Sequence, residues 1–174
     1  MRAVNDPSDQ QAKGAIMYSA LIAGMTFSNA GCHLPHGMSY AVSGLVRDFK
    51  PPQGYPQDQP MVPHGMSVVL NAPSVYRFTG DAAPERHLEA AQFLGAEMRG
   101  ANTNDAGEIV AAKLIEMMRA VNFPNGLNAV GYTDADAEQL AERAFPQQRV
   151  IKNAPRDVSK ATLAALFKGA MRYW

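Results

Sequence analysis

Apolar residues recur along most of the chain at the three-to-four-residue spacing of amphipathic helices. Two stripes are the clearest, each on a single helical face: Val110, Leu114, Met117, Met118 and Val121, and then Leu163, Leu166, Phe167, Ala170, Met171 and Trp174. No segment shows the two-residue alternation, rich in β-branched residues, that a sheet needs, and Val68–Leu70 is too short to count. The pattern therefore predicts an all-α fold, a multi-helix array.

Caps, prolines and glycines set the limits of the predicted helices. Ser8 or Asp9 caps the first, Thr103 or Asn104 caps the fifth, and Pro73 is expected to kink or interrupt the third. The proline-rich stretch 50–60 is incompatible with a helix or a central strand, and we expect an ordered surface excursion there. The predicted helices cover residues 8–30, 35–49, 63–78, 85–96, 104–121, 133–145 and 159–174.

Length and composition narrow the classes of protein that remain. A chain of 174 residues is the size of one domain, so we expect a single helical domain over residues 1–174. Lys plus Arg and Asp plus Glu both number 16, and this balance offers no surface charge for nucleic acid or an anionic membrane. No signal peptide or membrane-spanning segment is evident. Cys32 is the single cysteine, which excludes an internal disulfide and favours a reducing, cytoplasmic location.

The candidate chemistry lies in a repeated motif. The pentapeptide Pro-His-Gly-Met-Ser occurs at residues 35–39 and again at 63–67, so it accounts for two of the four histidines, His36 and His64. A proline in the first turn places each histidine at a helix N-terminus, where the helix dipole disfavours a positive charge and keeps the imidazole neutral for a metal. The following glycine leaves room for an ion or a cofactor to approach. The two helix starts could converge on one divalent cation. Alternatively, both motifs could only mark the positions at which two helices begin.

Two imidazoles bind a divalent metal only weakly, so further ligands are needed. His33 is a possible ligand but fits better as a pocket-lining residue, and His87 fits a surface or interhelix position. Cys32 is a possible soft ligand but is more typical of a small buried residue. Three aspartates are also available as ligands, but each stands in turn-like sequence, where helix termination or solvation explains it: Asp48, Asp58 and Asp81.

Two segments resemble the histidine motifs of the iron-containing alcohol dehydrogenases: Asn29–Tyr40 (NAGCHLPHGMSY) and Val62–Leu70 (VPHGMSVVL). The long insert between them resembles the hydroxyacid-oxoacid transhydrogenase branch of that family. The same holds for Pro84–Glu89, Val130–Tyr132 and Leu140–Arg149. The resemblance covers nearly the whole chain.

The resemblance implies the C-terminal, metal-binding helical domain of a two-domain enzyme, with His36 and His64 as metal ligands. It places two further ligands, an aspartate and a histidine, upstream of Met1. The metal would be Fe²⁺ or Zn²⁺, and NAD(P) would bind only with the N-terminal domain, because this chain has no glycine-rich phosphate loop and no cofactor-binding residue. Tyr40 stands where many members of the family have a relay histidine, and no catalytic residue is predicted.

The implied reaction is hydride transfer between a hydroxy acid or alcohol and a nicotinamide cofactor, in the transhydrogenase branch from a 4-hydroxy acid to a 2-oxo acid. A carboxylate substrate would need a cationic side chain to bind it. The spacing of the sequence selects none of the five candidates, which are Arg47, Arg77, Arg86, Arg99 and Arg149. We expect the chain to be inactive alone, and to form a homo-oligomer or associate with a cofactor-binding domain. The alternatives are a non-catalytic packing or oligomerisation domain and a weak two-histidine metal binder.

Overall fold

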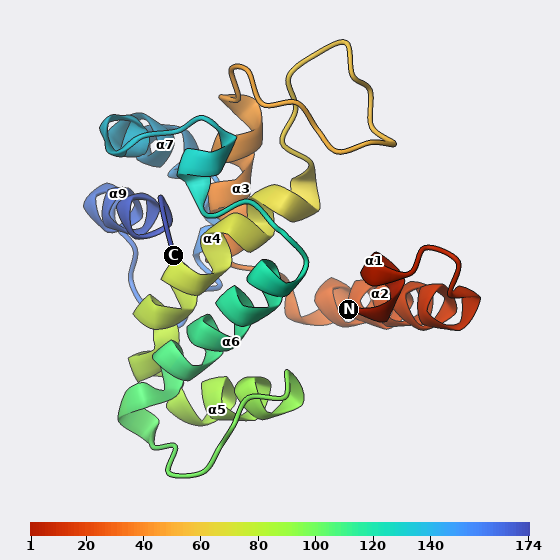
Figure 1. Ribbon diagram of the computed structural model, residues 1–174. Helices are drawn as coiled ribbons and strands as arrows, with labels where there is room; N and C mark the ends of the chain where they lie inside the picture. Colours follow the sequence, from red (N-terminus) through yellow and green to blue (C-terminus); the bar gives the residue numbers. More distant parts are fainter.

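Helices joined by loops make up the whole structure, and no strand is present (Figure 1). The structure is a computed structural model that describes residues 1–174. Short 3₁₀ turns lie at Gly80–Ala82, Thr103–Asp105, Leu127–Val130 and Asp134–Asp136. The α-helices are α1 Arg2–Asn5, α2 Gln10–Ala30, α3 Leu34–Gly44, α4 His64–Thr79, α5 Pro84–Phe93, α6 Ala106–Ala120, α7 Ala137–Ala144, α8 Gln148–Ile151 and α9 Lys160–Gly169. The prediction of an all-α fold is confirmed.

Several helix ends differ from those expected from the sequence. Helix α3 ends at Gly44 rather than at residue 49, because glycine has a low helix propensity and the following residues turn back across the core. Helix α5 ends at Phe93, and Gly95 beyond it takes a positive φ of 80° that closes the helix. Helix α4 continues past Pro73 to Thr79 without interruption. The short helix α8 was not predicted.

Side-chain caps fix the starts of four elements. The Asp9 carboxylate accepts from the Ala12 amide at 2.9 Å, and this selects Asp9 over Ser8 as the cap of α2. A reciprocal capping box at Thr133 begins the 3₁₀ turn that leads into α7, and another at Ser159 begins α9. Asn102, one or two residues earlier than predicted, caps the turn that leads into α6.

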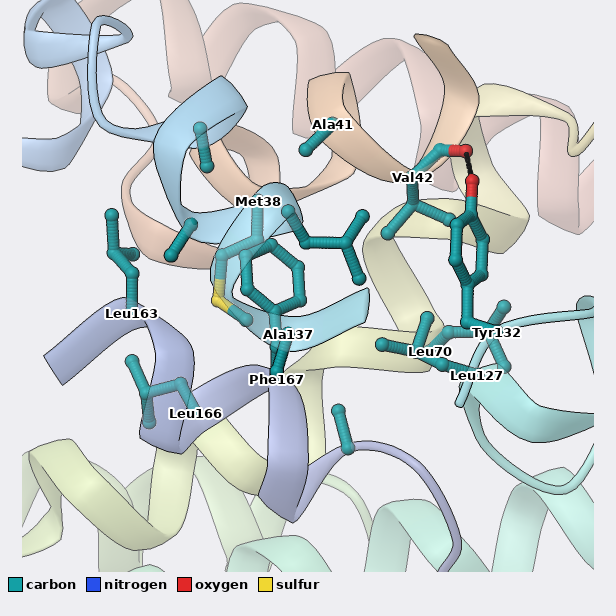
Figure 2. Packing of buried hydrophobic residues seen from close by; sticks show 14 of the residues in the cluster. Met38, Ala41, Val42, Leu70, Leu127, Tyr132, Ala137, Leu163, Leu166 and Phe167 are labelled. Carbon is teal, nitrogen blue, oxygen red and sulfur yellow. Dashed lines mark hydrogen bonds between the residues drawn. The ribbon is translucent and has the colours of Figure 1, made fainter. Parts of the chain in front are cut away.

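The core lies where α3 and α4 cross α7 and α9 (Figure 1). Figure 2 shows its packing, with the fully buried side chain of Met38 beside Phe167 and that of Leu70 near Leu127 and Tyr132. The Tyr132 hydroxyl donates to the Val42 carbonyl oxygen at 2.6 Å and so satisfies a carbonyl near the C-terminal end of α3. Burial raises the pKa of this Tyr132 hydroxyl to about 12, so it remains a donor at neutral pH. These contacts hold α3 and α4 in a fixed relative position.

A second layer packs on the far side of α4. Helix α6 lies along α4, and α5 covers α6. The backbones of α4 and α6 come unusually close where Gly80 meets Gly107, since a Cβ atom added at Gly80 would lie 2.5 Å from the Gly107 Cα. Glycine is required at this crossing because any side chain would push the two backbones apart.

Helix α2 differs from the others because it projects away from the core (Figure 1). It packs substantially only against the short helix α1, and Ala12 is its only buried residue. The rest of the helix, including most of its large apolar side chains, is exposed.

The α4–α6 crossing leads to a stability prediction. A Cβ atom at Gly107 would lie 2.6 Å from the Tyr76 carbonyl oxygen and 3.1 Å from the Arg77 Cα, both backbone atoms that cannot move independently. We expect Gly107→Ala to lower the free energy of unfolding by about 1–3 kcal/mol, measured by urea denaturation followed by circular dichroism.

The matched control is Gly44→Ala at the end of α3, where no atom lies within 4 Å of the added Cβ and the backbone φ is not positive. Alanine should leave the stability unchanged there or raise it by up to about 1 kcal/mol. Equal effects of the two substitutions would show that the close backbone approach does not limit the packing of α6.

Candidate metal centre

The two copies of the repeated motif meet at one point of the structure. His36 lies in the first turn of α3 and His64 is the first residue of α4. Their imidazole rings have centroids 5.4 Å apart with their planes inclined at 56°. The structure thus brings together two histidines that are 28 positions apart in the sequence, each in the first turn of one of two packed helices.

The serine that ends each motif makes the same hydrogen bond in both copies. The Ser39 hydroxyl donates to the His36 carbonyl oxygen at 2.8 Å, and the Ser67 hydroxyl donates to the His64 carbonyl oxygen at the same distance. Ser43, near the C-terminal end of α3, joins this helix to the start of α4, because its hydroxyl lies 3.0 Å from the Ser67 hydroxyl and 3.1 Å from the Val62 carbonyl oxygen. These serines were not singled out from the sequence, although their place in the repeat was a signal for them.

The glycines of the two motifs have different roles. A Cβ atom at Gly37 would lie 2.8 Å from the Ile151 Cγ1, so this glycine permits close packing of α3 against α8. That finding corrects the sequence-based interpretation, which reserved the space beside Gly37 for an ion. No atom lies within 4 Å of a Cβ atom at Gly65, which leaves open space beside His64.

The pair fits a shared divalent metal ion. Imidazole nitrogens bind zinc at about 2.0–2.1 Å, so two rings on one tetrahedral ion have centroids roughly 5 Å apart. The observed separation of 5.4 Å agrees with that geometry. Burial, followed by repulsion from His64, lowers the pKa of His36 and keeps this imidazole in the neutral form that a metal needs.

The chain itself supplies no third ligand. No group of three or more His, Cys, Asp and Glu side chains lies close enough together to hold a metal ion. Tyr40, one turn after His36, has its ring centroid 6.3 Å from that of His64. A phenol is a weak ligand when protonated, so Tyr40 lies beside the pair without completing it.

The other two histidines lie outside the pair. His87 is buried, its Nδ1–H donates to the Ala83 carbonyl oxygen at 2.8 Å, and its Nε2 accepts from the Thr79 hydroxyl at 2.9 Å. Both nitrogens are therefore occupied, and the interhelix position expected for His87 is found. His33 stands edge-on to the Tyr76 ring, with centroids 6.3 Å apart. Burial lowers the His33 pKa, and its shielded Nδ1 has no hydrogen-bond partner.

The remaining candidates from the sequence lie apart from the histidine pair or have partners elsewhere. Cys32 is half-buried, and its carbonyl oxygen accepts from the Asn153 side chain at 2.9 Å. Three of the arginines form ion pairs: Arg47 with Asp136, Arg77 with Glu108, and Arg86 with Glu89. The side chains of Arg99 and Arg149 form no ion pair. The three candidate carboxylates are exposed: Asp48, Asp58 and Asp81.

No helix combines the length and the apolar character that crossing a membrane requires.

Comparisons with known proteins identify relatives over nearly the whole chain. The hydroxyacid-oxoacid transhydrogenase, mitochondrial, of Xenopus laevis is 47% identical over 173 residues, which are 99% of this chain and 37% of that protein. A probable hydroxyacid-oxoacid transhydrogenase, mitochondrial, of Dictyostelium discoideum is 41% identical over 170 residues, 98% of this chain and 31% of that protein. The chain thus spans well under half the length of the curated relatives it matches.

Solved structures share the fold. A 1,3-propanediol oxidoreductase superposes with a TM-score of 0.82 at 28% identity, covering 97% of this chain and 40% of that one. An alcohol dehydrogenase from Oenococcus oeni gives a TM-score of 0.83 at 25% identity, with the same shares of both chains. The family model described as the C-terminal part of the Fe-containing alcohol dehydrogenase family matches residues 1–171. The chain therefore belongs to the iron-containing alcohol dehydrogenase family and corresponds to its C-terminal, helical part.

Proposed function

We propose that this chain is the metal-binding half of a hydroxyacid-oxoacid transhydrogenase, with His36 and His64 as ligands of one divalent ion. The observation that carries the proposal is the 5.4 Å separation of the two rings, each carried by the first turn of its helix, α3 or α4. A domain that served only for packing would have no need of two matched imidazoles there. The names of its relatives, which match 98–99% of the chain, supply the substrate class.

The residues of this chain position the reaction centre. A bound Fe²⁺ or Zn²⁺ would act as a Lewis acid that polarises the substrate oxygen during hydride transfer. His36 and His64 would hold the ion through neutral nitrogens, and the serine hydrogen bonds of each turn fix the backbone that carries these rings. The substrate would be a hydroxy acid or oxo acid, with hydride exchanged through NAD(P).

This half is proposed to be incomplete by itself. Metal sites usually have three or four protein ligands, and this chain brings only two together. The family resemblance assigns the other two ligands and the NAD(P) site to the part that precedes the C-terminal half. We therefore propose one helical domain over residues 1–174 that works with a cofactor-binding domain. The single Cys32 fits a reducing compartment such as the cytoplasm, while the relatives carry mitochondrial names.

Metal titration tests the histidine pair directly. We expect the purified chain to bind Zn²⁺, or Fe²⁺ without oxygen, in a 1:1 ratio by calorimetry and elemental analysis, although more weakly than a four-ligand site does. His36→Ala and His64→Ala should each weaken binding by on the order of tenfold or more, because each removes one of the two ligands.

Tyr40→Phe is the matched control, since it alters a neighbour of His64 without removing a ligand nitrogen. It should bind metal as the unaltered chain does. If both alanine variants bind as tightly as the unaltered chain, the metal is held elsewhere and the proposed site is wrong.

Activity should depend on the missing half. We expect the chain alone to transfer no hydride from 4-hydroxybutyrate to 2-oxoglutarate, measured by product formation. Joining it to the part of the Xenopus laevis relative outside the matched segment should restore turnover, because that part would supply the other ligands and the cofactor site.

His64→Ala in the joined protein should then reduce turnover by at least about 10²-fold through loss of the metal. Full activity of the joined His64→Ala protein would separate the reaction from this metal centre. Activity of the isolated chain would show that the second half is dispensable.

A further inference from the structure

Helix α2 carries an exposed apolar face that the core does not use. Seven large apolar side chains of α2 are exposed, and spacings of one, four, five and eight residues place five of them on one side of the helix. Their exposed fractions range from 43% to 74%. We call this set the α2 face: Met17, Tyr18, Leu21, Ile22 and Met25.

The rest of the chain offers no partner for the α2 face. Helix α2 packs substantially only against α1, and the segment from Gly14 to Ala30 holds no charged residue. A hollow of about 530 Å³ between Tyr18, Ile22 and Phe27 adds room for the side chains of a packed neighbour. Exposed apolar surfaces of this kind on a folded chain are typical of contact sites.

The chemistry of α2 favours a protein as the occupant. A helix that binds a membrane surface usually carries lysine or arginine on its polar side, and α2 has no cation after Lys13. Nucleic acid would also require positive charge. At 21 residues the helix is about 32 Å long, which suits the flank of a folded domain.

The position of α2 connects it with the metal centre. Helix α2 ends at Ala30, and only the link Gly31–His33 separates it from α3, which carries His36 in its first turn. The Asn153 side chain donates to the Cys32 carbonyl oxygen in this link and ties it to the end of α8. A polypeptide seated along α2 therefore reaches the same end of α3 at which the histidine pair lacks ligands.

We propose that the α2 face is the docking surface for the polypeptide that completes the metal centre, in the same chain or as a separate one. The occupant corresponds to the part of the transhydrogenase relatives outside the matched segment, which is more than half of the Xenopus laevis protein. This inference rests on the proposed function. It adds to it the surface through which the two halves recognise each other.

A second copy of this chain fits the α2 face less well. Each copy would bring the same pair of histidines and no additional cluster of His, Cys, Asp and Glu side chains. The relatives, by contrast, contain a large further part that must contact this one somewhere. The α2 face is the largest group of exposed apolar side chains in the chain and lies next to the incomplete site.

Assembly from separate halves tests the proposal. The chain is mixed with the part of the Xenopus laevis relative outside the matched segment, and complex formation is measured without metal by light scattering and calorimetry. We expect a 1:1 complex. Leu21→Glu and Met25→Glu should each weaken it by at least about tenfold, since each buries an unpaired charge in an apolar contact.

Phe93→Glu is the matched control, because Phe93 is 81% exposed at the end of α5, away from α2. It should assemble as the unaltered chain does. Circular dichroism should show unchanged helix content for all three variants, because Leu21, Met25 and Phe93 lie on the surface.

Three outcomes would overturn the proposal: assembly that the α2 variants leave unaffected, a homodimer of this chain that Leu21→Glu dissolves, or binding to neutral lipid vesicles that the same variant abolishes. Metal binding by the complex is measured separately from assembly. A complex that depends on the α2 face but binds no metal would support the docking surface and refute the proposed function.

Discussion

The packing of α3 against α4 is the constraint on which the candidate site depends. The Ser39 and Ser67 hydroxyls bond the His36 and His64 carbonyl oxygens within the first turn of each helix, and the hydrogen bond between Ser43 and Ser67 joins the end of α3 to the start of α4. Met38 of α3 and Leu70 of α4 are fully buried in the core to which α9 also contributes. The imidazoles of His36 and His64 are consequently held by the backbone and the core, so their proximity does not depend on a network of long side chains.

Much of this arrangement could be predicted from the sequence, because it is encoded locally. Capping residues and apolar spacing gave the main helices, and the repeated pentapeptide indicated two equivalent helix starts. Features that depend on distant partners were missed. The short helix α8 packs against α3, and the contact of Gly37 with Ile151 joins the same two segments, which are far apart in sequence. The number of potential metal-binding side chains that come together likewise could not be predicted from the sequence, because it depends on how the fold places them.

Membership of the iron-containing alcohol dehydrogenase family gives the histidine pair a chemical context. The pair matches the spacing of two imidazoles on one ion, and burial keeps the His36 nitrogen neutral. Tyr40, one turn after His36, places a phenol ring rather than a third imidazole beside the pair.

The contact between Gly37 and Ile151 has a consequence for how such a site can be tuned. Gly37 follows His36 directly, and a Cβ atom there would meet the Ile151 side chain of α8. Helix α8 therefore helps to fix the position of the first turn of α3, which carries His36. A bulkier residue at position 37, or a different side chain at position 151, would shift the first turn of α3 and change the distance between the His36 and His64 rings. An apolar contact that touches neither ring thus helps to set the geometry of the pair.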